Sequence, residues 1–446
     1  MPTGRRRPAI LGRSLAAAIV LLAVAAGLAP LLLPGTLIGR DAGPVAAAAV
    51  FVASYLALAI GRVPGLAVDR AGVALVGAAL MVACGALPLE DAYRAVDLDT
   101  LTLLLGMMIV VANLRLAGVF ALVAAWAVRR ARHPLALLAI VTAIAGLLSA
   151  FLVNDAICLV LSPIVLEVTL SLRRNPVPFL LAVAMAANIG STATITGNPQ
   201  NMLIGSFSQI GYAQFAASLA PVAAIGLVLA FLVIALLHRS EFAAGERRAP
   251  ALPQPRVYNV LALRALVATA ALIVLFFAGQ PPAKAAIVIA GLLLLTRRVR
   301  SERVYAEIDW SLLLMFAGLF VVVAGAEHAL WGGETAAVAG QLHLGRLPVL
   351  SLATAVLSNI VSNVPAVLLL RPFVASLPDP HAGWLTVAMA STFAGNFTVL
   401  GSIANLIVVQ RAAAQGVTIG FWDYFKVGAP LTLITIPLGV LWLSLF

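Results

Sequence analysis

The sequence Asp97-Leu-Asp-Thr-Leu-Thr-Leu-Leu-Leu-Gly106 returns as Asp309-Trp-Ser-Leu-Leu-Leu-Met-Phe-Ala-Gly318, 212 residues further along the chain. Each copy opens with an aspartate of the kind that caps a helix and continues into an apolar run. The two runs, 97–115 and 308–328, are long enough to cross a hydrocarbon core of about 30 Å, which needs about 20 residues per helix. The match predicts a chain built from two related halves.

Two further blocks support this repeat and occur in the same order. Leu148–Asn154 matches Leu357–Asn363 at an offset of 209 residues. The offset then falls to 204 for three matched pairs, which are Thr194 and Thr398, Gly197 and Gly401, and Asn201 and Asn405. Three blocks in one order with a slowly drifting offset indicate an internal duplication.

The composition is that of a membrane protein. Hydrophobic residues fill 63% of the 446 positions, charged residues fill 10%, and the mean hydropathy is +1.08. Soluble domains carry about 25% charged residues, so the expected fold class is an all-α polytopic membrane protein. The 35 Gly and 25 Pro, many of them inside the apolar runs, predict broken helices. Cys84 and Cys158 offer neither a disulfide framework nor a metal-ligand spacing.

We expect about 11 transmembrane helices. They lie at 14–34, 44–61, 70–88, 97–115, 177–210, 213–238, 259–278, 283–297, 308–328, 383–410 and 425–446. Two other apolar pairs, 134–172 and 347–375, have polar residues at their centres, and each forms either two full spans or a hairpin that returns to its own side. Residues 5–35 are long for a cleaved signal peptide and contain Arg13, so a first span is preferred there.

The net charge of +11 comes mostly from short arginine clusters between the apolar runs. This distribution marks cytoplasmic loops and not a nucleic-acid-binding surface. The clusters lie at 5–7, 129–132, 173–174, 239–256 and 297–303. In a bacterial-type inner membrane the N-terminus is then cytoplasmic and the C-terminus outside, with an interfacial helix at 117–128. Asp97 enters from outside and Asp309 from the cytoplasm, so the halves are inverted, as in many secondary transporters.

The centres of the two apolar pairs form the first candidate site. One contains Asn154 and Asp155, and the other contains Ser362, Asn363 and Pro365. Polar groups at this depth are rare and are functional candidates by default. An asparagine can bind an ion through its carbonyl oxygen and brace a turn through its N–H groups, although each could simply cap a helix break. Asp155 suits a proton carrier or a Na⁺ ligand, unless it is a structural acid bonded to the backbone.

Two helix breaks, Asn188–Asn201 and Ala394–Asn405, form the second candidate site. Gly costs a helix about 1 kcal/mol and Pro about 3, so neither segment sustains a regular helix. Freed carbonyls suit a cation and a helix N-terminus suits an anion; the alternative is close packing of small residues. The candidate ligands are Ser191, Thr192, Thr194, Thr196, Asn198, Asn201, Asn396, Thr398, Ser402 and Asn405. The candidate hinges are Gly190, Gly197, Pro199, Pro365, Gly395 and Gly401.

The sequence lacks the motifs of proteins that use ATP or zinc, and this limits the energy sources expected for transport. It has no G-x-x-x-x-G-K-[ST] motif for ATP hydrolysis and no HExxH zinc motif. The chain is therefore not expected to be an enzyme or to need a cofactor. Transport would be driven by Na⁺ or a proton as coupling ion, or by a separate ATPase subunit.

Several of these motifs resemble those of one superfamily. Asn154-Asp-Ala-Ile-Cys-Leu-Val-Leu-Ser-Pro-Ile-Val165 and Ser362-Asn-Val-Pro-Ala-Val367 resemble the tips of arsenite permeases. Thr194-Ile-Thr-Gly-Asn-Pro-Gln-Asn201 resembles the break of sodium–proton antiporters, the melanosomal P-protein and citrate-transporter relatives. Over most of residues 40–440 the chain is similar to the ion transporter superfamily with its citrate-transporter-like domain.

The resemblance implies a scaffold and a mobile transport domain that moves by an elevator mechanism, often in a homodimer. It also implies that 134–172 and 347–375 are re-entrant hairpins whose tips face the two breaks. The expected organisation is scaffold spans at 1–96, a first inverted repeat at 97–238, a cytoplasmic linker at 239–258, scaffold spans at 259–307 and a second inverted repeat at 308–446.

The expected function is ion-coupled transport of a small anion or oxyanion across the lipid bilayer, with arsenite or antimonite efflux as its most specific form. A sodium–proton antiporter is the first alternative, because of Asp155 and the break at Gly197–Asn201. A di- or tricarboxylate carrier is the second, although the tips of those carriers read Ser-Asn-Thr and here they read Val-Asn-Asp and Ser-Asn-Val. A passive channel or a membrane scaffold is the alternative from a different class.

Overall fold

The computed structural model describes residues 37–60, 67–130, 133–243, 258–296, 299–331 and 335–445. Within these ranges every regular element is helical, in agreement with the expected all-α class. Seven of the described helices have at least 18 residues and are apolar enough to cross a bilayer, and seven shorter helices are also apolar. The chain divides into two compact units, each described by itself. Unit 1 comprises Met1–Leu101, Asp309–Leu344 and Ile360–Pro378, and unit 2 comprises Thr102–Ile308, Gly345–Asn359 and Asp379–Phe446.

Unit 1 is built around two closely packed helices, α3 and α16. Its elements are α2 (Leu37–Ile60), α3 (Arg70–Ala83), α4 (Leu89–Ala95), α16 (Trp310–Ala326), η2 (Glu327–Trp331), α17 (Thr335–Gln341) and α19 (Asn363–Ala375). Gly318 on α16 lies so near α3 that a Cβ atom there would be 2.6 Å from the carbonyl carbon of Ala74. The Asp309 carboxylate accepts the Leu312 N–H at 3.0 Å. The predicted helix cap at Asp309 is therefore confirmed.

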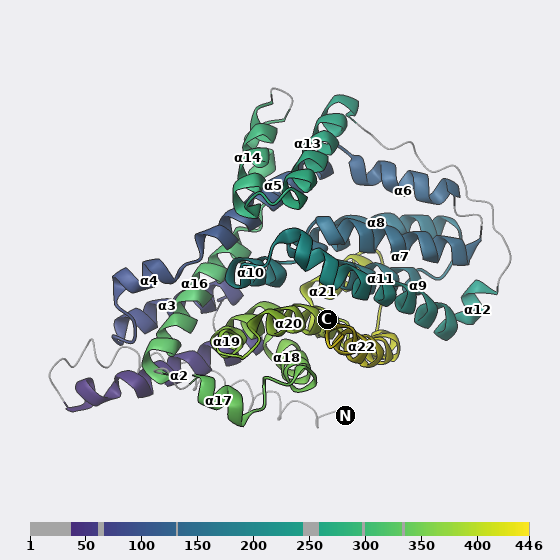
Figure 1. The fold of residues 1–446 in the computed structure, drawn as a ribbon. Helices are drawn as coiled ribbons and strands as arrows, with labels where there is room; N and C mark the ends of the chain where they lie inside the picture. Colours follow the sequence, from purple (N-terminus) through teal and green to yellow (C-terminus); the bar gives the residue numbers. More distant parts are fainter. Residues whose placement is uncertain are drawn as a thin grey trace, which may run out of the picture. The chain divides into compact units, whose positions relative to one another are not determined.

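Unit 2 holds the helices that carry most of the candidate site. Those from the first half are α5 (Leu98–Leu116), α6 (Val119–Arg130), α7 (Pro134–Phe151), α8 (Asn154–Ser171), α9 (Val177–Ser191), η1 (Ile195–Gly197), α10 (Pro199–Ser208), α11 (Tyr212–Leu237) and α12 (Arg239–Phe242). Those from the second half are α13 (Asn259–Phe277), α14 (Pro282–Leu294), α15 (Ser301–Tyr305), α18 (Leu347–Val361), α20 (Pro380–Ala394), η3 (Val399–Gly401), α21 (Ile403–Ala413) and α22 (Phe421–Leu443). In Figure 1, α7, α8, α9 and α11 lie together, and α20 packs beside α22.

The observed helices follow the predicted apolar runs, with one interruption that was not foreseen. The run 70–88 is not one helix, because α3 ends at Ala83 and Gly85 adopts a φ of 73° before α4 begins. The run 117–128, predicted to be an interfacial helix, forms α6. The first run, 14–34, and most of the linker 239–258 lie outside the described residues.

The two apolar pairs with polar centres are both helix–turn–helix elements. α7 ends at Phe151 and α8 starts at Asn154, so the turn is only two residues long. A single residue, Ser362, separates α18 from α19, and its φ of 79° is rare for a residue with a Cβ atom. In both pairs the tip asparagine, Asn154 or Asn363, is the first residue of the second helix.

We expect the stability of the protein to fall in mild acid because of His238, which follows the last residue of α11. Burial lowers the pKa of this imidazole below 6.5, and a hydrogen bond to the Ile234 backbone and the Asp423 and Glu241 carboxylates offset only part of the effect. Below about pH 6.5 the unfolded chain therefore binds a proton that the folded chain resists. Thermal unfolding in detergent between about pH 5 and pH 8 should show this loss, and His238→Gln should reduce it. An unchanged pH profile in that variant would exclude this histidine as the cause.

Candidate functional site

The first helix break lies between α9 and α10 and is formed by local capping. α9 ends at Ser191, and Asn198 adopts an extended conformation with φ −154° and ψ 164°. Pro199 then occupies the first position of α10, where its missing N–H leaves no helical bond unmade. The Asn198 Oδ1 atom accepts the Asn201 N–H at 2.8 Å. The break predicted from Gly197 and Pro199 is thus present, and the Asn-Pro pair begins the next helix.

The second break has the same construction at an offset of 204 residues. α20 ends at Ala394, a 3₁₀ turn spans Val399–Gly401, and α21 begins at Ile403. Ser402 is extended, with φ −147° and ψ 145°, and its Oγ accepts the Ala404 N–H at 3.3 Å. Serine here does what asparagine does in the first half, since both are favoured helix N-caps.

Two repeat-related asparagines brace these breaks through matching hydrogen bonds. Asn201 Nδ2 donates to the carbonyls of Ser191 and Thr194, at 3.1 and 3.0 Å. Asn405 Nδ2 donates to the carbonyls of Gly395 and Thr398, at 2.7 and 3.1 Å. All four acceptors are shifted by the same 204 residues, so the repeat read from sequence extends to individual hydrogen bonds.

Asn188 lies at the centre of the buried network that joins the two breaks. Its Nδ2 donates to Asn396 Oδ1 and to Asn405 Oδ1, both at 2.9 Å. Its Oδ1 accepts from Asn154 Nδ2 at 3.1 Å and from Ser402 Oγ at 3.2 Å. The amide therefore makes four hydrogen bonds, which use both of its N–H groups and both lone pairs of its oxygen. One side chain connects the α8 tip to both ends of the second break.

The hydroxyl groups of the first break are largely bonded within the protein. The Ser191 Oγ donates to the Asn188 carbonyl at 2.7 Å and accepts from Asn198 Nδ2 at 2.9 Å. Thr192 Oγ1 donates to the same carbonyl at 3.4 Å. Thr194 Oγ1 donates to the Ala150 carbonyl, and Thr196 Oγ1 pairs with the Tyr212 hydroxyl at 2.8 Å. These four residues therefore stabilise the shape of the site. Only the lone pairs on their hydroxyl oxygens that accept no hydrogen bond are left to contact a ligand.

Three asparagine oxygens in unit 2 are left without a hydrogen-bond partner. They are the Oδ1 atoms of Asn154, Asn201 and Asn359, and each is buried. The Nδ2 groups of the same side chains are all engaged, so only acceptors remain. A buried, unpaired carbonyl costs about 1–3 kcal/mol. Oxygen acceptors of this kind suit a hard cation or a ligand that carries O–H groups.

The second tip belongs to unit 1. Asn363 is buried there and its Oδ1 likewise has no hydrogen-bond partner. Pro365 was predicted as a helix break, but the turn falls at Ser362 and Pro365 lies in the first turn of α19, where proline is tolerated. The Pro365 carbonyl accepts the Tyr55 hydroxyl at 3.1 Å. This hydrogen bond joins α19 to α2 within unit 1.

The predicted hinge glycines have different surroundings. Gly395 and Gly401 face each other across the second break, where a Cβ on Gly401 would lie 2.8 Å from the Gly395 carbonyl oxygen. Gly197 lies against Ser191 in the first break. Gly190, by contrast, is inside α9 and serves the packing of α9 on α7.

Sequence reasoning missed several members of the site. Asn188 was quoted as the start of a motif but not counted as a ligand, although its amide makes four hydrogen bonds to other side chains. Thr392 was also missed, and its Oγ1 accepts from Asn198 at 3.2 Å and from Gln200 at 3.3 Å, which links the halves again. Asn359 was missed because its repeat equivalent is Ala150, so the internal comparison gave no signal there.

Comparison with known proteins identifies relatives over most of the chain. The family model described as "Citrate transporter" matches residues 55–394. An uncharacterized transporter of Mycobacterium tuberculosis is 31% identical over 428 residues, which cover 90% of this chain and 99% of the relative. The rice (Oryza sativa subsp. japonica) protein called Silicon efflux transporter LSI3 is 31% identical over 454 residues, covering 85% and 93%.

Among solved structures, the YdaH transporter of Alcanivorax borkumensis has a similar fold. Its TM-score is 0.58 at 16% sequence identity, and the match covers 80% of this chain and 86% of that protein. At this identity the likeness concerns the fold alone. The described helices thus have the architecture of an all-helical polytopic membrane protein.

Proposed function

This chain belongs to the citrate transporter family of multi-pass membrane transporters, and we propose that it is a secondary active transporter of a small anion or oxyanion. The observation that carries the proposal is the buried amide network around Asn188, which ties the tip residue Asn154 to the second break. Polar side chains inside apolar membrane helices are rare and are functional candidates by default. The orphaned oxygens of Asn154, Asn201 and Asn359 supply acceptors for what is carried.

The chemistry of the site favours a weakly charged oxyacid over a tricarboxylate. Apart from the Asp155 carboxylate, the proposed ligands offer amide and hydroxyl groups, and none of them is a lysine or an arginine. A fully ionised citrate would thus lack a basic partner, whereas a hydroxylated acid such as arsenite or silicic acid can donate O–H hydrogen bonds to amide oxygens. The name of the rice relative, a silicon efflux transporter, points to the same class. Arsenite or antimonite efflux is the most specific form of the proposal.

Coupling to Na⁺ is supported by the three unpaired amide oxygens, because hard cations prefer oxygen ligands. Coupling to protons would instead use Asp155, which lies in the first turn of α8. A sodium–proton antiporter with no further substrate is the second candidate function, on the strength of these same groups.

The wider arrangement is part of the proposal. It comprises two inverted halves, with scaffold spans at 1–96 and 259–307, repeats at 97–238 and 308–446, and re-entrant tips at Asn154 and Asn363. The N-terminus would be cytoplasmic and the C-terminus outside, in an inner membrane. A homodimer would move its transport domains by an elevator mechanism, and a separate ATPase would be an optional partner. Matching hydrogen bonds at the two breaks support the duplication.

Flux into proteoliposomes tests this function directly. Arsenite, silicic acid and citrate are each offered with and without imposed Na⁺ and pH gradients. We expect gradient-dependent flux of the first two and little of citrate. Proton movement that needs Na⁺ but no solute, and that is lost in Asp155→Asn, would favour the antiporter. Equal, uncoupled flux in both directions would make the protein a passive channel.

Asn154→Ala should raise the Na⁺ or solute concentration that gives half-maximal flux by about tenfold, equivalent to about 1.4 kcal/mol. The substitution removes one buried acceptor and one hydrogen bond to Asn188. Asn113→Ala is the matched control, since Asn113 is also buried in unit 2 but bonds only the Ile109 carbonyl of its own helix. Equal effects of the two changes would remove Asn154 from the proposed site.

A further inference from the structure

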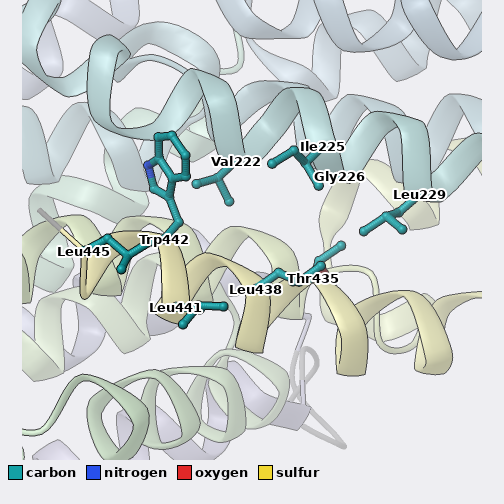
Figure 2. A pocket seen from close by; sticks show the side chains of 9 residues that line it. All are labelled: Val222, Ile225, Gly226, Leu229, Thr435, Leu438, Leu441, Trp442 and Leu445. Atoms are coloured by element: carbon teal, nitrogen blue, oxygen red, sulfur yellow. The ribbon is translucent and has the colours of Figure 1, made fainter.

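A groove between α11 and α22 is lined almost wholly by apolar side chains, and its one hydroxyl group, that of Thr435, donates to the Leu431 carbonyl of its own helix (Figure 2). Its volume is about 150 Å³. The walls are formed by Val222, Ile225 and Leu229 from α11 and by Leu438, Leu441 and Leu445 from α22. Such a surface offers a water molecule few hydrogen-bond partners. The groove therefore needs a hydrocarbon occupant if it is to be filled.

The groove opens onto exposed apolar surface of two helices. α11 and α22 are both candidate spans, of 26 and 23 residues. Ile225, Leu438 and Leu441 are 46%, 40% and 58% exposed, so they present apolar surface at the mouth of the groove. The one polar group of Trp442, its indole N–H, donates to the Ser218 carbonyl at 3.0 Å. The indole ring thus borders the groove while its N–H is satisfied elsewhere.

The floor of the groove touches the helices that carry the network. A Cβ on Gly226 would lie 2.8 Å from Ile189 Cγ2 and 3.7 Å from Phe393 Cζ. Ile189 follows Asn188 in α9, and Phe393 lies three residues before Asn396 at the end of α20. An occupant of the groove therefore contacts Gly226, which packs against residues near the ends of both broken helices.

We propose that one acyl chain of a bilayer lipid occupies this groove and acts as a wedge between α11 and α22. Within a membrane the driving force is van der Waals contact along a surface that would otherwise leave a void. The occupant holds the spacing of the two spans behind Ile189 and Phe393, and through them supports the network around Asn188. Its effect on flux rests on the proposed transport function, but its binding does not.

Fluorescence of Trp442 provides the test of binding. The variant keeps Trp442 and replaces the other tryptophans, Trp126, Trp310, Trp331, Trp384 and Trp422, by Phe. It is reconstituted into phosphatidylcholine vesicles with acyl chains brominated at mid-chain or left unbrominated, and gel filtration checks that it is folded. Brominated lipid is then diluted with unbrominated lipid until contact with the surrounding bilayer no longer quenches tryptophan fluorescence. We expect quenching of Trp442 to persist at this dilution.

Two substitutions on α11 distinguish lipid bound in the groove from lipid that merely contacts the outside of the helix. Ile225→Phe fills the groove and should abolish the persistent quenching, whereas Leu236→Phe, on the same helix and 71% exposed but outside the groove, should leave it intact. Flux measured in parallel should change in Ile225→Phe only. Equal quenching in both variants would overturn the proposal. So would disulfide cross-linking of Leu438→Cys between two copies, since the occupant would then be a second chain.

Discussion

Replacing Asn188 by Leu is expected to abolish gradient-driven flux, with a loss of at least about 100-fold, equivalent to about 3 kcal/mol. The substitution leaves two buried oxygens without a donor, on Asn396 and Asn405, and two buried donors without an acceptor, on Asn154 and Ser402. Each orphaned group costs about 1–3 kcal/mol when it cannot reach water. The breaks and the tip would then lose the one side chain that joins them.

Folding and function are separated here by a second variant and a control. Asn188→Asp keeps the size and the acceptor but replaces the donor by a second oxygen, which repels Asn396 Oδ1 and Asn405 Oδ1. It should be as inactive as Asn188→Leu while still eluting as a monodisperse species. Asn113→Ala should retain flux within about twofold, because its amide bonds only its own helix. Normal flux in Asn188→Asp would show that the network is structural filling and not part of the transport site.

The second large effect is expected at Gly190, where α9 crosses α7. A Cβ atom there would lie 2.1 Å from the Gly146 carbonyl oxygen and 2.5 Å from its Cα. The obstacle is backbone, so no side-chain rotation can make room, and the two helices would have to separate. We expect Gly190→Ala to destabilise the protein by more than about 4 kcal/mol, the range of severe core disruption. Yield of monodisperse protein and thermal unfolding in detergent measure this.

Two other glycines serve as matched controls for that substitution. Gly291→Ala on α14 meets nothing within 4 Å and should unfold at or above the temperature of the unmodified protein, because alanine favours a helix over glycine by about 1 kcal/mol. Gly146→Ala meets only the flexible end of Leu227, at 2.6 Å, and should be milder than Gly190→Ala although it lies on the other side of the same crossing. If all three variants were equally stable, the close approach of α7 and α9 would not be a requirement of the fold.

Both predictions concern residues whose structural role could be predicted only in part from the sequence. Gly190 was expected to be a hinge because glycine weakens helices, yet it lies within α9, and the reason for glycine is the neighbouring backbone. Asn188 begins the motif that was recognised, but its partners are 34 to 217 residues away along the chain. No local spacing could have revealed that they converge.

By itself the sequence determined the membrane class, the positions of most helices and the two breaks. These follow from local chemistry, because apolar run length, Gly and Pro act over a few residues. Tertiary structure decided which polar groups meet, since the contacts of Asn188 with Asn154, Asn396 and Asn405 depend on how α8, α9 and α21 pack. It also decided that most hydroxyls of the first break bond within the protein, which leaves the amide oxygens of Asn154, Asn201 and Asn359 unpaired. Whether a buried polar group finds a hydrogen-bond partner depends on how the whole chain packs, so the sequence of the motif alone does not show it.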